Sequence, residues 1–266
     1  MKKTKLKDNL TGILCPVIFG LVVFVLWQFE ILHALLKTNT FTLPLPSRIV
    51  TIIMENMPKM ILNTKATVTV AVAGLILGSL FGYLIAIFAA LAPKWGTGGL
   101  RIVAAFNAVP IVALAPVITN LTKDVSKDAS VRSMVAKILV VTLFCTASMS
   151  ITAYRGLTEL RPFSLDLLKT YAANKATVFL KLRLPNSVPY IFTALRVSVP
   201  ASIISALVSE YFAEYIIGLG RQIRENIVQA QYTSAWSYIA VACLIGILFY
   251  LLLLFCERLI LKDHSR

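Results

Sequence analysis

Six long apolar stretches constrain this chain more than any other feature of its sequence. They span residues 11–29, 66–92, 102–121, 135–154, 188–212 and 235–256. Each is about as long as a membrane-crossing α-helix, which takes roughly 20 apolar residues. The composition agrees, since 58% of the residues are hydrophobic and only 14% are charged, an apolar share too large for a water-soluble domain to bury. The sequence therefore predicts an all-α, polytopic membrane protein with about six transmembrane helices.

Lysine and arginine are distributed unequally over the segments between these stretches. With the amino terminus inside the cell, the inner segments hold 15 of the 26 cations and the outer segments hold 10, while Arg196 lies within the fifth stretch. Cations beside membrane spans favour the cytoplasmic side, so both termini are predicted to be cytoplasmic. The basic amino terminus precedes an apolar run of about 19 residues, longer than the core of a cleaved signal peptide. We therefore expect a multi-pass protein that stays in the cell membrane.

Neither the charge nor the cysteines point to a nucleic acid or a metal. The net charge is +14, but the cations sit in short gaps between apolar runs and form no basic face interleaved with aromatic residues. Membrane lipid is the expected surrounding, and no nucleic acid partner is expected. The four cysteines lie inside apolar runs without C-x-x-C spacing, which argues against a zinc site and against a disulfide framework.

The chain is expected to fall into two parts. Residues 1–65 hold the first apolar stretch and an outer segment, in which L-P-L-P-S at 43–47 predicts an extended turn. Ser47 is expected to cap a short amphipathic helix over residues 48–57. Residues 66–266 form the core domain, which contains a basic loop at 162–186.

The second apolar stretch carries three glycines at a spacing of four residues: Gly74, Gly78 and Gly82. This spacing places them on one face of a helix, where their small size lets a neighbouring backbone approach closely. We interpret them as a packing surface between helices.

The third stretch contains two prolines and two asparagines: Asn107, Pro110, Pro116 and Asn120. Two prolines in one helix free backbone carbonyls that lipid cannot satisfy. The helix is therefore expected to face protein or a wet cavity. It either forms a wall of a pathway through the membrane or packs against its neighbours.

Two positions in the fifth stretch carry charge. Arg196 at mid-depth would cost roughly 2.5–3.5 kcal/mol on insertion scales, so it either extends to the inner interface or faces a cavity. Glu210, one helical turn before Glu214 near the outer end, either lines the mouth of a pathway or belongs to a solvated rim.

The loop between the fourth and fifth stretches has more internal order than a plain linker. Ser164 is expected to cap a short helix, and Asp166 in its first turn suits the positive end of the helix dipole. Asn174 is expected to end that helix, and Leu184-Pro185 to stop a second amphipathic turn. Two interpretations remain open on these residues: a compact knob that docks a partner, and an amphipathic segment lying on anionic lipid.

The same loop resembles the EAA signature of the membrane subunits of binding-protein-dependent ABC importers. In that pattern Asp166-Leu167-Leu168 stands at Glu-Ala-Ala, Ala172 stands at the glycine, and Leu184-Pro185 stands at Leu-Pro with no gap. The continuation N-S-V-P-Y-I-F-T-A-L-R, the L-P-L-P-S turn, N-A-V-P-I-V-A-L-A-P in the third stretch and G-L-G at 218–220 are also similar to the family. The nearest subgroup resembles permeases for sulfonates, taurine, nitrate or thiamine-precursor pyrimidines.

The resemblance implies a pore-forming permease that couples to separate ATPase subunits. Its expected partners are two ATP-binding subunits, an extracytoplasmic solute-binding protein and a second copy of the permease. The implied ATPase-coupling residues are Ser164, Asp166, Leu167, Leu168, Ala172, Lys175, Leu184 and Pro185, and the expected pathway residues are Asn107, Pro110, Pro116, Asn120, Arg196 and Glu210. The chain has no G-x-x-x-x-G-K-[ST] loop, so no cofactor is expected on it, ATP belongs to the partner, and the chain is not expected to be an enzyme.

The residues alone also allow two alternative functions, a self-contained secondary transporter and a membrane-embedded enzyme. A self-contained secondary transporter would be expected to pair ionisable groups within the membrane, and Arg196 is the one such group that the stretches suggest. A membrane-embedded enzyme acting on lipid would need a cluster of acidic or histidine residues. The two histidines, His33 and His264, stand isolated near the ends of segments, which disfavours the enzyme.

Overall fold

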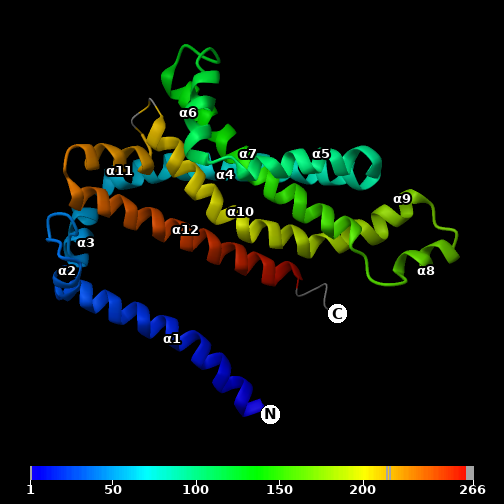
Figure 1. Cartoon of the computed structure of the whole chain (residues 1–266), viewed down its shortest axis with the longest axis horizontal. Helices are drawn as coiled ribbons and strands as arrows, with labels where there is room; N and C mark the ends of the chain where they lie inside the picture. The colour runs from blue at the N-terminus through cyan, green and yellow to red at the C-terminus, as the bar shows by residue number, and fades with distance from the viewer. Residues whose placement is uncertain (1, 214, 216, 262–266) are drawn as a thin grey trace. The chain divides into compact units, whose positions relative to one another are not determined.

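The computed structural model describes the backbone of residues 2–213, 215 and 217–261, and the side chains of these residues from Leu14 onward. Throughout this part of the chain the regular structure is helical (Figure 1), which confirms the predicted all-α class. Two compact units are present: Met1–Met60 with Ile223–Ala240, and Ile61–Gln222 with Val241–Arg266. The expected division into 1–65 and 66–266 stays a prediction.

The first unit is built around the turn that was expected before the second apolar stretch. It holds α1 (Lys2–Gln28), α2 (Ile31–Leu36) and α3 (Pro46–Glu55). The indole of Trp236 donates to the carbonyl of Thr42 (3.1 Å) and packs edge-on against Trp27, with ring centroids 5.8 Å apart. The prediction that Ser47 caps a helix over 48–57 is wrong, because α3 begins at Pro46 and Ser47 lies inside it. Ser47 instead exchanges two hydrogen bonds of 3.1 Å with the Gln28 amide.

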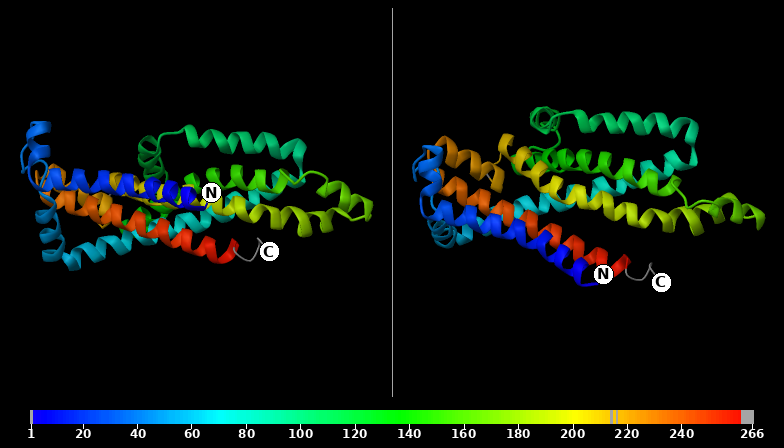
Figure 2. Two further views of the ribbon diagram at one scale, coloured as in Figure 1. Left: turned by 90° about the horizontal axis from the view of Figure 1, so that it is seen from below. Right: turned by 60° about the horizontal axis from the view of Figure 1, so that its bottom comes forward.

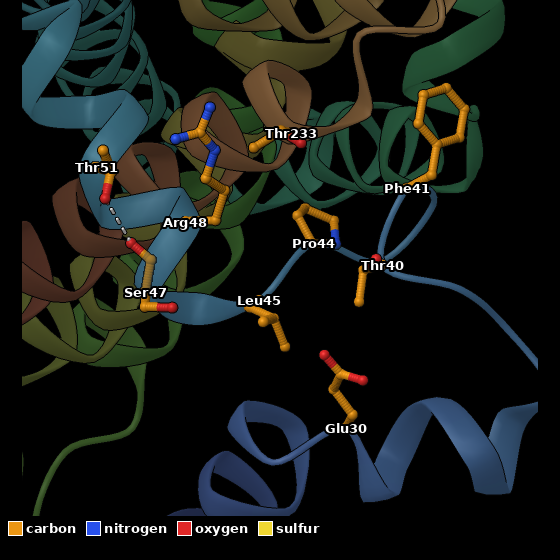
Figure 3. Close-up of a pocket in the computed structure, with 9 residues that line it drawn as sticks. All are labelled: Glu30, Thr40, Phe41, Pro44, Leu45, Ser47, Arg48, Thr51 and Thr233. Carbon is orange, nitrogen blue, oxygen red and sulfur yellow. Dashed lines mark hydrogen bonds between the residues drawn. The ribbon is translucent and has the colours of Figure 1, made fainter.

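A pocket of about 650 Å³ opens in this first unit beside the turn (Figure 3). Glu30 and Arg48 are its charged lining residues, and Thr51 donates to the carbonyl of Ser47 (3.1 Å) at its edge. Glu30 has a left-handed backbone (φ 63°) and stands between α1 and α2. The pocket involves none of the residues that the sequence singled out for function.

The remaining elements follow in chain order. They are α4 (Met57–Leu91), α5 (Pro93–Ala105), η1 (Phe106–Ala108), α6 (Ile111–Leu121), α7 (Ala129–Thr158), α8 (Ser164–Thr170), α9 (Lys175–Val178), a π-helical turn η2 (Phe179–Arg183), α10 (Leu184–Phe212), α11 (Leu219–Val228) and α12 (Tyr232–Leu261). In the second unit α7 and α10 run side by side and make an extensive contact (Figures 1 and 2).

Four helices in the described chain are long and apolar enough to cross a membrane: Met57–Leu91, Ala129–Thr158, Lys175–Phe212 and Tyr232–Leu261. They coincide with the second, fourth, fifth and sixth predicted stretches. The first stretch contributes a shorter apolar helix, Leu14–Gln28, among the residues with described side chains.

The expectation of one continuous helix over 102–121 is wrong. The segment breaks into α5 with η1 and then α6, which are bent by 104°. Val109 is extended (φ −79°, ψ 122°) and Pro110 follows it as the residue before α6. A residue before proline is driven out of the helical region by the proline ring, so the break has a local cause.

The three glycines of α4 form a tight seam against α7. A Cβ atom placed on Gly74 would lie 2.4 Å from Val141 Cβ. On Gly78 and Gly82 it would lie 2.6 Å from the backbone carbonyls of Thr142 and Thr146. The two backbones therefore approach as closely as glycine allows, which confirms the predicted packing surface.

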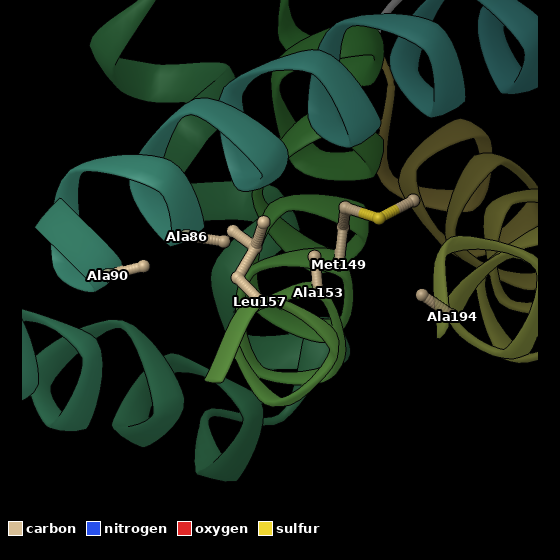
Figure 4. Close-up of a cluster of buried hydrophobic side chains, with 6 residues drawn as sticks. All are labelled: Ala86, Ala90, Met149, Ala153, Leu157 and Ala194. Carbon is tan, nitrogen blue, oxygen red and sulfur yellow. The ribbon is translucent and has the colours of Figure 1, made fainter. Parts of the chain in front are cut away.

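The α4–α7 seam continues into a small buried core that also includes α10 (Figure 4). Its members are Ala86 and Ala90 of α4, Met149, Ala153 and Leu157 of α7, and Ala194 of α10, none more than 5% exposed. Four of these six side chains are single methyl groups. Such small side chains let three helices meet at short distance, and dispersion between well-packed atoms then holds them together in lipid.

Serine side chains cover the buried face of α10. Ser202, Ser205 and Ser209 each donate to a backbone carbonyl one turn earlier, at 2.7–2.8 Å. These hydroxyls are therefore satisfied within their own helix and bring no unpaired donor into the contact with α7. The serines act here as small packing residues.

Substituting Gly78 with alanine should destabilise the protein by about 1–3 kcal/mol, because the added methyl group meets a backbone carbonyl and forces α4 and α7 apart. Gly246→Ala in α12 is the matched control, since a Cβ atom there has no neighbour within 4 Å. Thermal unfolding of the full chain in mild detergent measures both. Equal melting temperatures for the two variants would contradict the seam.

Candidate coupling and translocation sites

The predicted coupling loop extends beyond the ends of α7 and α10, the two helices that it joins (Figure 1). It consists of α8, α9 and the π-helical turn. Leu165 and Leu168 of α8 are half-buried, and Asp166 and Lys169 lie on the outside with an ion pair of 3.1 Å between them. Asp166 stands in the first turn of α8, as predicted.

Ser164 begins α8 but does not cap it. The residue before the helix is Phe163, which has a left-handed backbone (φ 63°) and makes no capping bond. The Ser164 hydroxyl instead donates to the carbonyl of Arg161 (2.6 Å). The predicted cap is wrong because Ser164 already has helical geometry, whereas a capping residue must lie outside the helix.

Ala172 lies in the turn that ends α8. Ala172 is left-handed (φ 49°), its N–H donates to the carbonyl of Lys169 (2.8 Å), and the N–H of Ala173 donates to Leu168 (3.0 Å). This pair of bonds is the Schellman ending of a helix, in which glycine is the preferred left-handed residue. The EAA pattern has its glycine at this position, and here an alanine adopts the same backbone.

The prediction that Asn174 ends α8 is wrong. The helix stops at Thr170, four residues earlier. Asn174 instead caps the next helix, since its side-chain oxygen accepts from the N–H of Thr177 (2.8 Å). Asparagine is favoured at both kinds of helix boundary, which is why its local pattern did not decide between them.

Leu184-Pro185 does not stop the helix either. Residues Lys175–Phe212 form one helical path, and the turn Phe179–Arg183 is π-helical, with the N–H of Leu184 donating to the carbonyl of Phe179. Proline in a regular α-helix clashes with the carbonyl four residues earlier. The wider π turn accommodates this, so the proline leaves a local bulge and the helix continues.

The base of the loop is attached to the helix core by four side chains. Asn186 donates to the carbonyls of Gly156 (2.7 Å) and Glu159 (3.1 Å) at the end of α7. Arg183 donates to the carbonyl of Ala90 (3.3 Å) in α4, and the hydroxyls of Tyr83 and Ser187 are 2.9 Å apart. The first turn of α10 is therefore bonded to both α4 and α7.

An exposed aromatic and aliphatic ridge runs along the outside of α8. Phe163 is 83% exposed, Leu167 59% and Tyr171 77%. Leu167 and Tyr171 are about one helical turn apart and share a face, and Phe163 stands directly before the helix. The sequence reading selected Leu167 and missed the other two. The i, i+4, i+8 repeat of apolar residues was the signal that could have identified them.

The residues expected on the pathway lie on the broken segment of η1 and α6 and on α10. Asn107, Pro110 and Asn120 are exposed and Pro116 is half-buried, all on the broken segment of η1 and α6. Arg196 and Glu210 both belong to α10, where a separation of 14 residues corresponds to about 21 Å. The structure therefore does not bring the six side chains into one cluster, and their role in a pathway stays a prediction.

Arg196 has an acidic partner that the sequence reading did not foresee. Its guanidinium makes a two-pronged pair with Glu257 of α12, with Nε–Oε2 at 2.8 Å and Nη2–Oε1 at 2.5 Å. The Glu257 side chain is only 9% exposed, and that of Arg196 is 47% exposed. A carboxylate this enclosed needs a cation, so the pair fixes α12 to α10.

Glu210 is fully buried, so the alternative of a solvated rim is wrong. Its Oε2 atom accepts from the Thr67 hydroxyl and from the N–H of Gly220, both at 2.9 Å. The Gly218 N–H donates to Asn63 (2.9 Å), and Gly218 itself has φ 133°. Glu210 thus anchors the chain at 218–220 beneath α4, while Glu214 lies outside the described residues.

A Cβ atom on Gly218 would lie 2.4 Å from the Glu210 carboxyl carbon. Glycine is therefore required at position 218 for two reasons: its positive φ angle and its close contact with the Glu210 carboxyl group. The G-L-G similarity noted in the sequence has this contact as its physical basis.

Replacing Ala172 with glycine should slow amide hydrogen exchange in α8 about fivefold or more, because an L-residue in the left-handed region costs roughly 1–2 kcal/mol that glycine avoids. The matched control is Ala176→Gly, an exposed helical alanine in α9, which should speed exchange because glycine disfavours helix. Hydrogen–deuterium exchange with mass spectrometry measures both. The same direction of change in the two variants would contradict the left-handed assignment.

A double-mutant cycle tests the pair between α10 and α12. Arg196→Gln should destabilise the full chain by about 1–3 kcal/mol, since it leaves a buried carboxylate without its cation. Glu257→Gln should cost less, because Arg196 is half-exposed, and the double variant should recover much of the loss. Thermal unfolding in detergent gives the coupling energy, and strictly additive effects would refute the pair.

Comparisons with known proteins agree with the architecture. The family of inner membrane components of binding-protein-dependent transport systems matches residues 78–262, more than two thirds of the chain. The formylaminopyrimidine transport permease protein ThiX of Halalkalibacterium halodurans is 26% identical over 234 residues, which cover 88% of this chain and 89% of that protein. A probable ABC transporter permease protein of Haemophilus influenzae is 28% identical over 149 residues, covering 56% of this chain and 58% of that protein.

The matched region contains α4 from residue 78 onward and the whole of α5 to α12 as far as residue 261, including the loop, Arg196 and Glu210. The chain is a multi-pass protein of the cell membrane and belongs to the family of inner membrane components of binding-protein-dependent transport systems.

Proposed function

We propose that this chain forms the translocation pathway for a small solute in an ABC importer and docks separate ATP-hydrolysing subunits through the loop 162–186. The observation that carries the proposal is the exposed ridge of Phe163, Leu167 and Tyr171. Large apolar side chains on a polar, basic loop are expensive in water. A partner that covers them removes this cost, and aromatic side chains are typical anchors of such interfaces.

The ridge favours a protein partner over a lipid surface. Asp166 and Lys169 stand next to it and pair with each other, so the face around the ridge carries both signs of charge. A segment that binds anionic lipid is expected to present cations without acids on its polar face. The surroundings of the ridge therefore suit a protein groove with its own mixture of polar groups.

The bonds at the base of the loop suggest how movement passes to the membrane. Asn186 and Arg183 connect the loop to the ends of α7 and α4, and α9 continues through the π turn into α10. Closure of the ATPase pair would then pull the loop and both helices together. In this proposal rigid-body rocking of the helix core alternates access to a central cavity.

Membership of the family supports a proposal for the rest of the assembly. We place both termini and the loop in the cytoplasm, ATP on the partner subunits, a solute-binding protein outside, and a second copy of this chain as the other half of the pathway. Asn107, Pro110, Pro116, Asn120, Arg196 and Glu210 remain the predicted pathway residues. The relative's name refers to a formylaminopyrimidine, which supports a small organic solute and does not identify it.

Replacing Leu167 or Tyr171 with glutamate should uncouple ATP hydrolysis from transport. Each change removes an exposed apolar anchor and adds a charge that the partner must desolvate, so solute uptake should fall at least tenfold. The chain is co-expressed and purified with its ATPase and reconstituted into proteoliposomes, and the binding protein is added with the solute. Solute uptake and ATP hydrolysis are then measured on the same preparation.

Val125→Glu is the matched control, because Val125 is a similarly exposed apolar residue (57%) in the segment that precedes α7. This variant should keep uptake within a factor of two of the wild type. Normal coupling in both ridge variants, or an ATPase that co-purifies equally well with them, would overturn the docking role.

A further inference from the structure

A groove of about 390 Å³ lies in the second unit between α4, the start of α7 and the residues that follow α10. Lys65 of α4 and Lys137 of α7 contribute its charged lining, and no lining residue described by the structure is acidic. The apolar part of the lining comes from Leu62, Ala66, Val70, Met134 and Ile217. The groove thus combines two cations with an apolar wall.

Lys137 is the unusual member of this set. It is only 5% exposed, although it carries a full charge on a helix that crosses the membrane. Its ammonium group donates to the carbonyl of Ile217 (3.2 Å), which fixes the cation at the wall of the groove. An ammonium group has three donors, so this one carbonyl does not saturate it.

Among the described residues around Lys137 and its groove, positive charges outnumber buried negative ones. Glu210 interacts with it electrostatically as an anion, and Arg221 does so as a cation. Lys65, which lines the same groove, adds a further positive charge. Asp128 precedes α7 and is solvated, and a hydrogen bond from the Ser130 N–H (2.8 Å) lowers its pKa, so it stays ionised as the cap of α7. Among the described residues that interact with Lys137 or line the groove, Glu210 is the one carboxylate, and the cations are Lys65, Lys137 and Arg221.

A purely structural role accounts for only part of this arrangement. Lys137 balances the charge of Glu210 but makes no hydrogen bond to it: the carboxylate accepts from Thr67 and Gly220 at Oε2, and its Oε1 has no hydrogen-bond partner among the described residues. The Lys137 ammonium donates instead to the carbonyl of Ile217. Such a role also leaves unexplained why a second lysine lines an adjoining groove with an apolar floor.

We propose that this groove binds an oxyanion group, such as a carboxylate or a phosphate, that is carried on an apolar body, with Lys65 and Lys137 as its cationic partners. Two cations that line one groove match the charge of an oxyanion such as a phosphate. The apolar lining takes the attached hydrocarbon. The headgroup of an anionic lipid and a free amphiphilic solute share this chemistry.

The test uses the purified full chain in a non-ionic maltoside detergent at low salt. Isothermal titration calorimetry with decyl phosphate probes a free amphiphilic anion, with dodecanol as the uncharged comparison. Native mass spectrometry after addition of phosphatidylglycerol or phosphatidylcholine probes the lipid headgroup. We expect saturable binding of decyl phosphate or a preference for phosphatidylglycerol over phosphatidylcholine. The first result identifies a free amphiphilic anion as the ligand, and the second identifies an anionic lipid.

Lys65→Gln should weaken that binding about tenfold, because each charge-assisted hydrogen bond contributes substantially to affinity. Lys65 is exposed, so this variant should fold normally, and Lys65→Arg should restore binding. Lys127→Gln is the control, since Lys127 is an exposed lysine outside the groove. Absence of saturable binding in both arms, or equal loss in the Lys65→Gln and Lys127→Gln variants, overturns the proposal.

Discussion

The close approach of α4, α7 and α10 is the contact on which the rest of the structure depends. In lipid no hydrophobic force drives helices together, so they associate where atoms pack at short range. Gly78 against Thr142, Ala194 in the shared core and the serine face of α10 all serve this one requirement. The charged residues buried beside these contacts, such as Glu210, are held in place because the backbones around them cannot separate.

The loop gains its stiffness from the same core. Its α9 end is continuous with α10, and Asn186 bonds the first turn of α10 to the last carbonyls of α7. A force applied to the ridge would therefore reach two core helices at once. This distinguishes the loop from a flexible linker, in which movement of one end would be absorbed by rotation of backbone angles.

Local patterns predicted what depends on local physics, and missed what depends on contacts between distant residues. The apolar stretches, the glycine face of α4 and Asp166 in the first turn of α8 could all be predicted from periodicity and composition. The break before Pro110 could also have been predicted, because the residue preceding a proline disfavours the helical conformation. Arg196 and Glu257 are 61 residues apart, and no local rule pairs them. Paired charges within the membrane had been expected of a secondary transporter, but here the Arg196–Glu257 pair joins two helices in a binding-protein-dependent family.

The π turn between α9 and α10 has a consequence for how such a loop can change over time. A π turn contains one residue more than the regular helix, and each residue turns the chain by about 100° about the helix axis. Losing one residue between Phe179 and Arg183 would turn the bulge back into regular helix and leave the parts on either side facing as before, whereas losing one residue from the regular part of α10 would rotate everything before that point by about 100°. The π turn is therefore the place at the base of the loop where the chain can gain or lose one residue without changing the direction in which the ridge faces.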